Sequence, residues 1–96
     1  MRKVRLTHAA KGHLKAIWRY SFETWGEGKA DAYLTEIEAK LNLLADNPNL
    51  GRNRPRIKTN YYSIKINRHI VFYLFDDEHI DVIGVLHEKM DISTWL

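Results

Sequence analysis

The chain contains no cysteine among its 96 residues. It therefore forms no disulfide bond and offers no thiolate ligands for zinc, and thiol redox chemistry is excluded. The longest uninterrupted apolar run, residues 70–75, is far shorter than the roughly 20 residues that span a bilayer. The basic amino end is not followed by the apolar segment of a signal peptide. We therefore expect a cytoplasmic protein without a membrane partner.

Acidic residues are also missing from two stretches, although the net charge is only +3. No Asp or Glu precedes Glu23, and none lies between Asp46 and Asp76. Each stretch holds six Lys or Arg residues: Arg2, Lys3, Arg5, Lys11, Lys15 and Arg19 in the first, and Arg52, Arg54, Arg56, Lys58, Lys65 and Arg68 in the second. Such clusters favour an acidic partner, either a nucleic acid or an acidic peptide. The alternative is a solvated basic face that binds nothing.

Two segments of the first half place apolar residues at the 3.6-residue period of an amphipathic helix. Thr7 is a suitable N-cap for the first helix, Gly26 ends it, and Pro48 prevents the second helix from continuing. The first apolar stripe consists of Ala10, Leu14, Ile17, Trp18, Ser21 and Trp25. The second consists of Ala30, Tyr33, Leu34, Ile37, Leu41, Leu44 and Ala45. Because the connection over residues 26–28 is short, we expect the helices to form an antiparallel hairpin.

The second half of the chain shows the patterns of β-strands. Tyr62, Ile64 and Ile66 alternate with polar residues, which is typical of a half-buried strand. Residues 70–75 are apolar on both faces and indicate a central strand, and residues 3–6 add an edge or neighbouring strand. We predict one α+β domain, residues 1–96, of order β-α-α-β-β-β. Its antiparallel helical hairpin packs on one face of a twisted, mainly antiparallel sheet.

Five histidines raise the question of a metal site or an acid/base catalyst. His8 and His13 lie five residues apart, on different sides of a helix, and no carboxylate joins them at ligand spacing. His69 and His79 occupy strand or turn positions where surface imidazoles are common. His87 ends the last strand, where it either acts in catalysis or bonds the backbone and fastens the C-terminal segment to the sheet. Because the sequence shows neither a second catalytic group nor a set of metal ligands, we predict no catalytic residue and no metal site.

The most specific signal is the sequence VLHEKMD at residues 85–91, which follows an alternating strand. It resembles the VLHxxMD ending of the ParE branch of the RelE/ParE toxin superfamily, with His87, Met90 and Asp91 at the motif positions. The resemblance covers nearly the whole chain: a basic first strand, two helices, an LAxNPxLGR connection at residues 44–52, and three consecutive strands. It implies a RelE/ParE-like fold.

The resemblance implies a toxin that traps DNA gyrase on broken DNA by binding it, without catalysis or a cofactor. It also implies a hetero-oligomer with a ParD-type antitoxin. The RelE branch instead cleaves messenger RNA with basic residues, but Ile70 stands where that branch usually has arginine, and Met90 and Trp95 replace its basic C-terminal run. His87 and Arg68 keep the ribonuclease alternative open, and a non-toxic binding module on the same scaffold is a third.

Two sets of residues are candidate binding sites, because an antitoxin arm that folds on the toxin needs an apolar groove beside positive charge. The predicted antitoxin site comprises Lys11, Lys15, Trp18, Arg19, Phe22, Trp25 and Tyr33. The predicted target site comprises Arg52, Arg54, Arg56, Lys58, Trp95 and Leu96. If residues 52–58 are extended, their four cations project on one side. The terminal Trp-Leu pair either packs on the core or anchors a partner. We expect no sequence-specific binding of nucleic acid by the chain alone.

Overall fold

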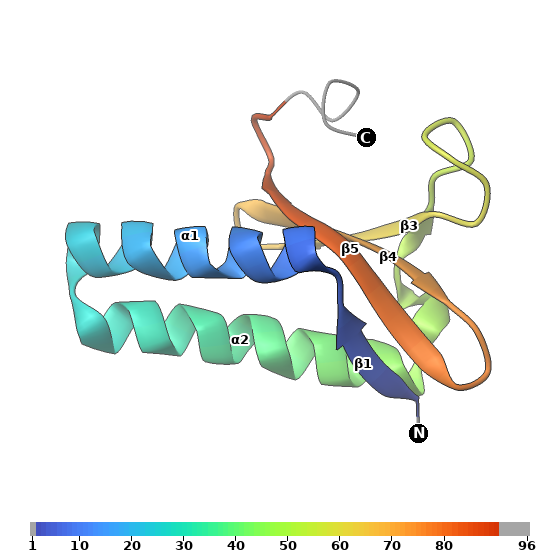
Figure 1. Ribbon diagram of the computed structural model, residues 1–96, viewed down its shortest axis with the longest axis horizontal. Coiled ribbons are helices and arrows are strands. Elements are labelled where there is room, and N and C mark those ends of the chain that lie inside the picture. Colours follow the sequence, from blue (N-terminus) through green and yellow to red (C-terminus); the bar gives the residue numbers. More distant parts are fainter. Residues whose placement is uncertain (1, 91–96) are drawn as a thin grey trace.

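The computed structural model describes residues 2–90 and has the predicted order of helices and strands (Figure 1). Two short elements, which were not predicted, precede the three consecutive strands. The elements are β1 (Lys3–Leu6), α1 (His8–Trp25), α2 (Glu27–Asp46), the 3-10 helix η1 (Pro48–Leu50), β2 (Arg52–Asn53), β3 (Tyr62–Ile66), β4 (His69–Phe75) and β5 (His79–His87). Within the described residues, no helix is both long and apolar enough to cross a membrane.

The ends of the first helix confirm the predicted capping residues. The Thr7 hydroxyl accepts a hydrogen bond from the Ala10 backbone N–H at 3.1 Å and donates one to the Ile83 carbonyl at 3.0 Å. Gly26 ends α1 with a φ of 93°, which glycine adopts without the steric cost that a Cβ would cause. The expected connection over residues 26–28 is wrong, because α2 already begins at Glu27 and Gly26 alone reverses the chain.

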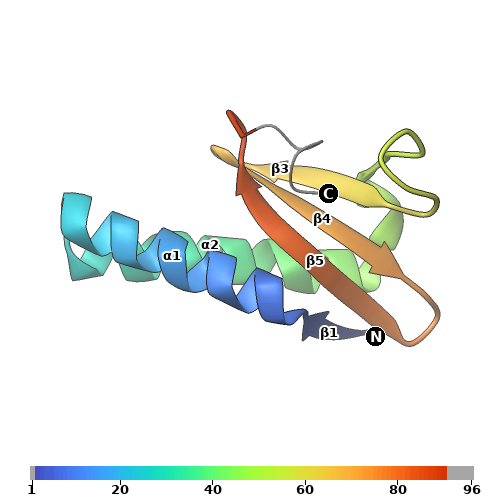
Figure 2. The same ribbon diagram turned by 45° about the horizontal axis from the view of Figure 1, so that its top comes forward.

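The strands form one sheet in the order β1-β5-β4-β3-β2. The pairs β2–β3, β3–β4 and β4–β5 are antiparallel, whereas β1 runs parallel to β5 at the edge of the sheet. Parallel strands need a long crossover connection, and the helical hairpin supplies it. Figure 2 shows the hairpin on one side of the sheet formed by β3, β4 and β5. The first strand therefore fixes the hairpin to the last strand.

The core lies between the hairpin and the facing side of the sheet. Most residues of the two predicted stripes are buried or half-buried, but Trp25 is 58% exposed. The stripe prediction is wrong at Trp25 because the closed end of the hairpin extends beyond the sheet (Figure 1). The buried core cluster consists of Ala10, Ile17, Ile37, Leu41, Leu44, Ala45, Ile66, Val71, Tyr73, Ile80, Val82 and Val85.

The basic segment after η1 is extended only at Arg52–Asn53. Beyond it the chain turns back on itself, and the Arg54 N–H donates to the Tyr61 carbonyl at 2.7 Å. Pro55 has no N–H to continue a strand. The Arg54 side chain is half-buried and donates from Nε to the Ser63 hydroxyl at 2.8 Å, which explains why Ser63, on an expected polar position, is only 3% exposed. The condition for four cations on one side is therefore not met.

A buried tyrosine holds the connection between the hairpin and the sheet. The Tyr73 hydroxyl in β4 donates to the Pro48 carbonyl at 2.7 Å and accepts from the Gly51 N–H at 3.0 Å. A Cβ at position 51 would collide with this hydroxyl, so glycine is needed for the close approach. Burial raises the pKa of Tyr73, so the hydroxyl keeps the proton that it donates. The 44–52 connection is thus fixed from the core.

We expect Tyr73→Phe to lower the free energy of unfolding by about 1–3 kcal/mol, because two buried backbone groups lose their partner. Urea unfolding of the purified protein measures this change. The control is Tyr20→Phe, since the Tyr20 side chain is 64% exposed and its hydroxyl should contribute less than about 0.5 kcal/mol. Equal effects of the two substitutions would contradict the anchoring role of Tyr73.

Candidate binding cleft

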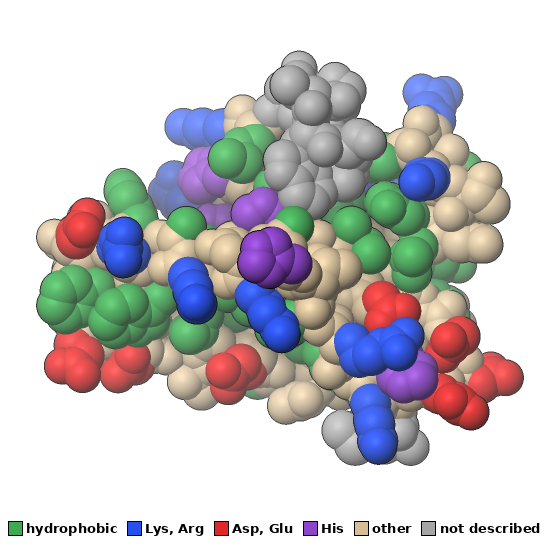
Figure 3. Space-filling view, viewed as in Figure 1, with side chains coloured by type: hydrophobic (Ala, Val, Ile, Leu, Met, Phe, Trp, Pro, Cys, Tyr) green, Lys and Arg blue, Asp and Glu red, His purple; other side chains and the backbone are tan. Residues whose placement is uncertain are grey.

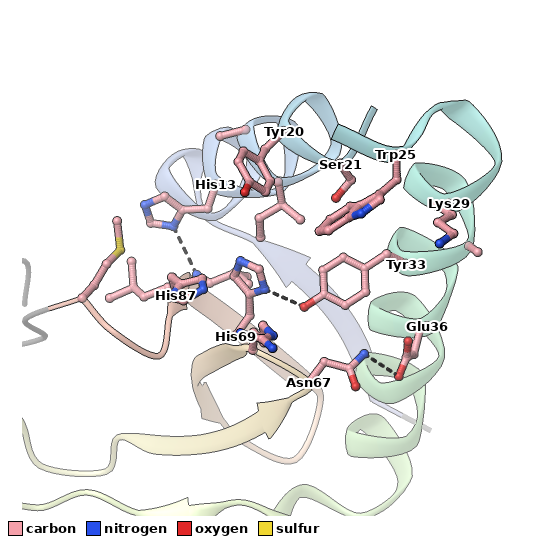
Figure 4. Close-up of a pocket in the computed structure, with 17 residues that line it drawn as sticks. His13, Tyr20, Ser21, Trp25, Lys29, Tyr33, Glu36, Asn67, His69 and His87 are labelled. Carbon is pink, nitrogen blue, oxygen red and sulfur yellow. Dashed lines mark hydrogen bonds between the residues drawn. The ribbon is translucent and has the colours of Figure 1, made fainter. Parts of the chain in front are cut away.

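A cleft of about 1280 Å³ opens where the closed end of the hairpin extends past the sheet (Figure 4). Its walls come from α1, α2, the β3–β4 turn and the end of β5. Apolar and aromatic side chains dominate the lining, among them Ile17, Tyr20, Trp25, Val85 and Met90. Such an open, apolar cleft between two layers is suited to binding a segment of another chain.

Small residues on the helices make room for the cleft. Ala16 and Ser21 on α1 and Ala32 on α2 line it, and Ser21 is buried. Figure 4 shows the Trp25 ring turned toward the cleft beside Ser21. Tyr20 meets Trp25 edge to face, with 6.1 Å between ring centroids. Two exposed aromatic rings therefore stand at the mouth of an apolar cavity, which is typical of an interface anchor.

Tyrosine and histidine side chains form the floor of the cleft (Figure 4). The Tyr33 hydroxyl lies 2.5 Å from His69 Nδ1. The His69 and His87 rings meet edge to face at 5.3 Å because the two residues are opposite each other in the β4–β5 register. On the α1 side, His13 Nδ1 accepts from the Val85 N–H at 3.1 Å. Each imidazole is thus held by a neighbouring element.

Burial determines the charge of this floor. It lowers the pKa of His69, and the neighbouring His87 lowers it further. Burial also lowers the pKa of His13 and raises the pKa of Tyr33. The neutral forms of these three side chains are therefore favoured at neutral pH. Among residues 2–90, no three His, Asp or Glu side chains lie close enough to hold a metal ion.

The turn after β5 is tied to the β3–β4 turn. His87 Nδ1 accepts from the Lys89 N–H at 3.2 Å, and the Glu88 N–H donates to the Arg68 carbonyl at 2.9 Å. Lys65 pairs with the Glu88 carboxylate at 3.2 Å and holds the pKa of that carboxylate below its usual value. A bond between the His87 ring and the backbone is what we expect if this residue has a structural rather than a catalytic role. Asp91, the last residue of the motif, lies outside the described residues.

The structure divides the predicted antitoxin site between two surfaces. Trp25 and Tyr33 line the cleft. Trp18 instead donates from Nε1 to Asp31 Oδ1 at 2.9 Å and stacks on Phe22 with 5.1 Å between centroids, and neither ring lines the cleft. The three predicted cations also lie outside the cleft: Lys11, Lys15 and Arg19. Trp25 thus faces the cleft, whereas the bond to Asp31 holds the Trp18 ring outside it.

The predicted target residues are only partly described. Arg52, Arg56 and Lys58 are exposed on the turn after η1, whereas Arg54 is bound to Ser63 as described above. Figure 1 shows this turn on the opposite side of the molecule from the closed end of the hairpin. The remaining two predicted residues, Trp95 and Leu96, lie outside residues 2–90.

Sequence reasoning missed several residues of the cleft. His13 and Tyr20 are seven residues apart on α1, a spacing that places them on one side of the helix. His69 was expected as an ordinary surface imidazole but is only partly exposed and bonded to Tyr33. Its position opposite His87 follows from the hairpin register, which would have required the β-bulge near Phe72 to be known.

Comparisons with known proteins point to one family. A family model described as "ParE toxin of type II toxin-antitoxin system, parDE" matches residues 4–92. Toxin ParE1 of Mycobacterium tuberculosis is 36% identical over 89 residues, covering 92% of this chain and 91% of the relative. Toxin ParE1 of Caulobacter vibrioides is 32% identical over 96 residues, covering 100% and 99%.

Two solved structures share the fold. The chromosomal ParDE TA system from P. aeruginosa has a TM-score of 0.77 at 18% identity, covering 91% of this chain and 96% of that chain. The toxin-antitoxin complex RelBE2 from Mycobacterium tuberculosis has a TM-score of 0.69 at 18% identity, covering 90% and 96%. At this identity the likeness shows the fold alone, and it confirms the predicted α+β architecture.

The histidines of the cleft predict a loss of stability in mild acid. In the folded state the pKa values of His13 and His69 lie below the ordinary histidine value of about 6.5, so the unfolded chain binds more protons as the pH falls. The free energy of unfolding should therefore decrease from pH 7 to pH 5. We expect His69→Asn, which keeps an acceptor for Tyr33, to reduce this dependence in urea titrations. An equal reduction in the control His8→Asn, at an exposed position, would contradict the assignment.

Proposed function

The chain belongs to the ParE toxin family of type II toxin–antitoxin systems, and from this premise we propose that it inhibits DNA gyrase by binding it and is neutralised by a ParD-type antitoxin. The observation that carries the proposal is the family match over residues 4–92, together with relatives that are called ParE toxins and match over almost their full length. The toxin acts by stabilising one state of the gyrase–DNA complex through its higher affinity for that state.

Three features support binding rather than ribonuclease chemistry. Ile70 lies in β4 where the ribonuclease branch usually has arginine, and Met90 follows the last strand in place of a basic residue. The cleft histidines His13 and His69 have lowered pKa values and make hydrogen bonds to neighbouring elements. Cations that would stabilise the charge of a phosphoryl transition state are therefore not concentrated on the cleft floor.

We assign the cleft to the antitoxin. Its volume exceeds the roughly 300–1,000 Å³ of small-molecule pockets, and its open form accommodates a folded segment of chain. The apolar rings of Tyr20 and Trp25 offer an anchor, and Lys29 and Arg68 on the walls attract acidic side chains. An arm with one apolar face and acidic neighbours matches both features.

We assign target binding to the basic turn after η1 and to the C-terminal Trp95 and Leu96. The turn that carries the exposed cations Arg52, Arg56 and Lys58 lies at the other end of the molecule from the closed end of the hairpin (Figure 1). These cations suit DNA phosphates or an acidic patch of gyrase. Apolar terminal residues suit insertion into the enzyme. The two parts of this site differ in the range of their interactions, because the cations attract a partner over a distance and the apolar tail stabilises the complex only on contact.

The function is tested with purified gyrase and supercoiled DNA. We expect the toxin to cause accumulation of enzyme-linked broken DNA, and primer extension on cellular transcripts after toxin induction to show no new cuts. Cuts within ribosome-bound codons that disappear in folded His87→Ala would instead establish the ribonuclease alternative. Neither effect, with a folded protein that still binds its antitoxin, would favour the non-toxic binding module.

The basic turn generates a prediction about ionic strength. Replacing Arg52 and Arg56 together by alanine should reduce DNA breakage by roughly tenfold at about 0.05 M salt and much less at about 0.3 M, because salt screens long-range attraction. Deleting Trp95 and Leu96 should abolish breakage at both salt concentrations. Arg54→Ala is the internal comparison: it removes the bond to Ser63, so its effect should be independent of salt. A salt-independent defect of the Arg52/Arg56 variant would contradict the long-range role.

The cleft generates a prediction about the antitoxin, for which the protein encoded by the adjacent reading frame is the natural probe. We expect Trp25→Ala to weaken antitoxin binding by about thirtyfold, or roughly 2 kcal/mol, as for other interface anchors. Calorimetry measures the affinity, and urea unfolding checks the fold. The matched control is Phe22→Ala, an exposed aromatic of the same helix that does not line the cleft. A defect in the control but not in Trp25→Ala would place the antitoxin elsewhere.

A further inference from the structure

The side of the hairpin that faces away from the cleft, which we call the outer face, separates positive from negative charge. Lys11, Lys15 and Arg19 are exposed on α1 at a spacing of four residues, which aligns them in one row. Figure 3 shows Lys and Arg side chains along α1 and Asp and Glu side chains below them on the hairpin. The acidic row on α2 comprises the exposed Glu27, Asp31 and Glu38.

An apolar seam runs between the two rows. Near the closed end, Trp18 stacks on Phe22, which is 45% exposed. Toward the sheet, a shallow groove of about 270 Å³ continues the seam, with Leu14 and Leu34 half-buried in its walls. Apolar surface flanked by opposite charges on its two sides is a protein-binding surface rather than a nucleic-acid surface, because the acidic row repels phosphates.

Basic residues of one row and acidic residues of the other lie at similar distances from Gly26 along the hairpin axis. Lys15 precedes Gly26 by 11 residues on α1, and Glu38 follows it by 12 residues on α2. At about 1.5 Å per residue, these two residues lie at the same height along the hairpin axis to within about 2 Å. Arg19 and Asp31 lie 7 and 5 residues from Gly26, so their heights match to within about 3 Å. Within residues 2–90, none of these four side chains takes part in an ion pair.

We propose that the outer face binds a second copy of this chain. A two-fold axis parallel to the helices places α1 of one copy against α2 of the other. Because the rotation axis is parallel to the helices, each residue keeps its height along the hairpin axis. Lys15 then faces Glu38 of the second copy and Arg19 faces its Asp31, while the two apolar seams meet at the axis. The surface is therefore complementary to itself, as an isologous interface requires.

The size of the outer face sets the strength of this dimer. A 20-residue helix is about 30 Å long and two packed helices are about 20 Å wide, so each copy contributes roughly 600 Å². The total of roughly 1,200 Å² is at the lower limit of stable interfaces, so the dimer is weak and reversible. It leaves the cleft open. The inference depends on the proposed function only where it assigns that cleft to the antitoxin.

Sedimentation equilibrium of the purified full chain over a range of concentrations tests the proposal without gyrase or antitoxin. We expect a monomer–dimer equilibrium that Lys15→Glu alone and Glu38→Lys alone each weaken by at least about tenfold, because each reversal makes two symmetric pairs repulsive. When the two single variants are mixed, every Lys15–Glu38 pair across the interface again joins opposite charges. A heterodimer should therefore form from two proteins that are separately monomeric.

The controls separate this interface from others. Lys29→Glu reverses a charge on the cleft wall and should leave dimerisation unchanged. A wild-type protein that stays monomeric at the highest attainable concentration would overturn the proposal, as would a dimer that is insensitive to both charge reversals. If the reversals weaken antitoxin binding and no dimer exists, the outer face belongs to the antitoxin. Inactivity toward gyrase would overturn the proposed function and leave the dimer result standing.

Discussion

The hairpin reaches further than the sheet that it covers, and both candidate protein-binding surfaces follow from this mismatch. A single glycine joins helices of 18 and 20 residues, which are about 27 and 30 Å long. The sheet covers only the end of the hairpin that is remote from Gly26 (Figure 1). Apolar residues near the closed end therefore lack a sheet to pack against. On one side they enclose the cleft, and on the other they form the seam of the outer face.

Backbone pairing rather than ion pairing holds the hairpin in place. β1 joins β5 in parallel register from Lys3 to Leu6, and the Thr7 side chain adds a bond to the same strand. Arg5 also pairs with Asp81 at 2.6 Å, but the arginine is exposed, and such surface pairs contribute little. Tyr73 fixes the C-terminal end of α2 through Pro48 and Gly51. Both chain connections at the open end of the hairpin are thus anchored to the sheet or the core, and the closed end projects from this fixed base.

The helices and strands could be predicted because each is determined locally. Thr7, Gly26 and the apolar stripes act within a few residues, and the alternation in residues 62–66 needs no knowledge of distant neighbours. The cleft could not be predicted in the same way. Whether Trp25 is buried or exposed depends on where the sheet ends, and the sequence of α1 does not determine where the sheet ends. The turn of residues 54–61 depends on a bond between Arg54 and Ser63 of a later strand, and a charge pattern does not reveal it.

Neutralisation by an antitoxin in the cleft has a simple steric explanation under the proposed assignments. The basic turn lies at the other end of the molecule from the closed end of the hairpin, so an arm bound in the cleft would not cover this turn. The proposed target residues Trp95 and Leu96 are different, because Met90 lines the cleft and Leu96 follows it by six positions in the sequence. Six residues span at most about 20 Å. Under the proposed assignments, an arm bound in the cleft would therefore compete with gyrase for Trp95 and Leu96. Such a mechanism leaves the cations free to attract DNA even in the neutralised complex.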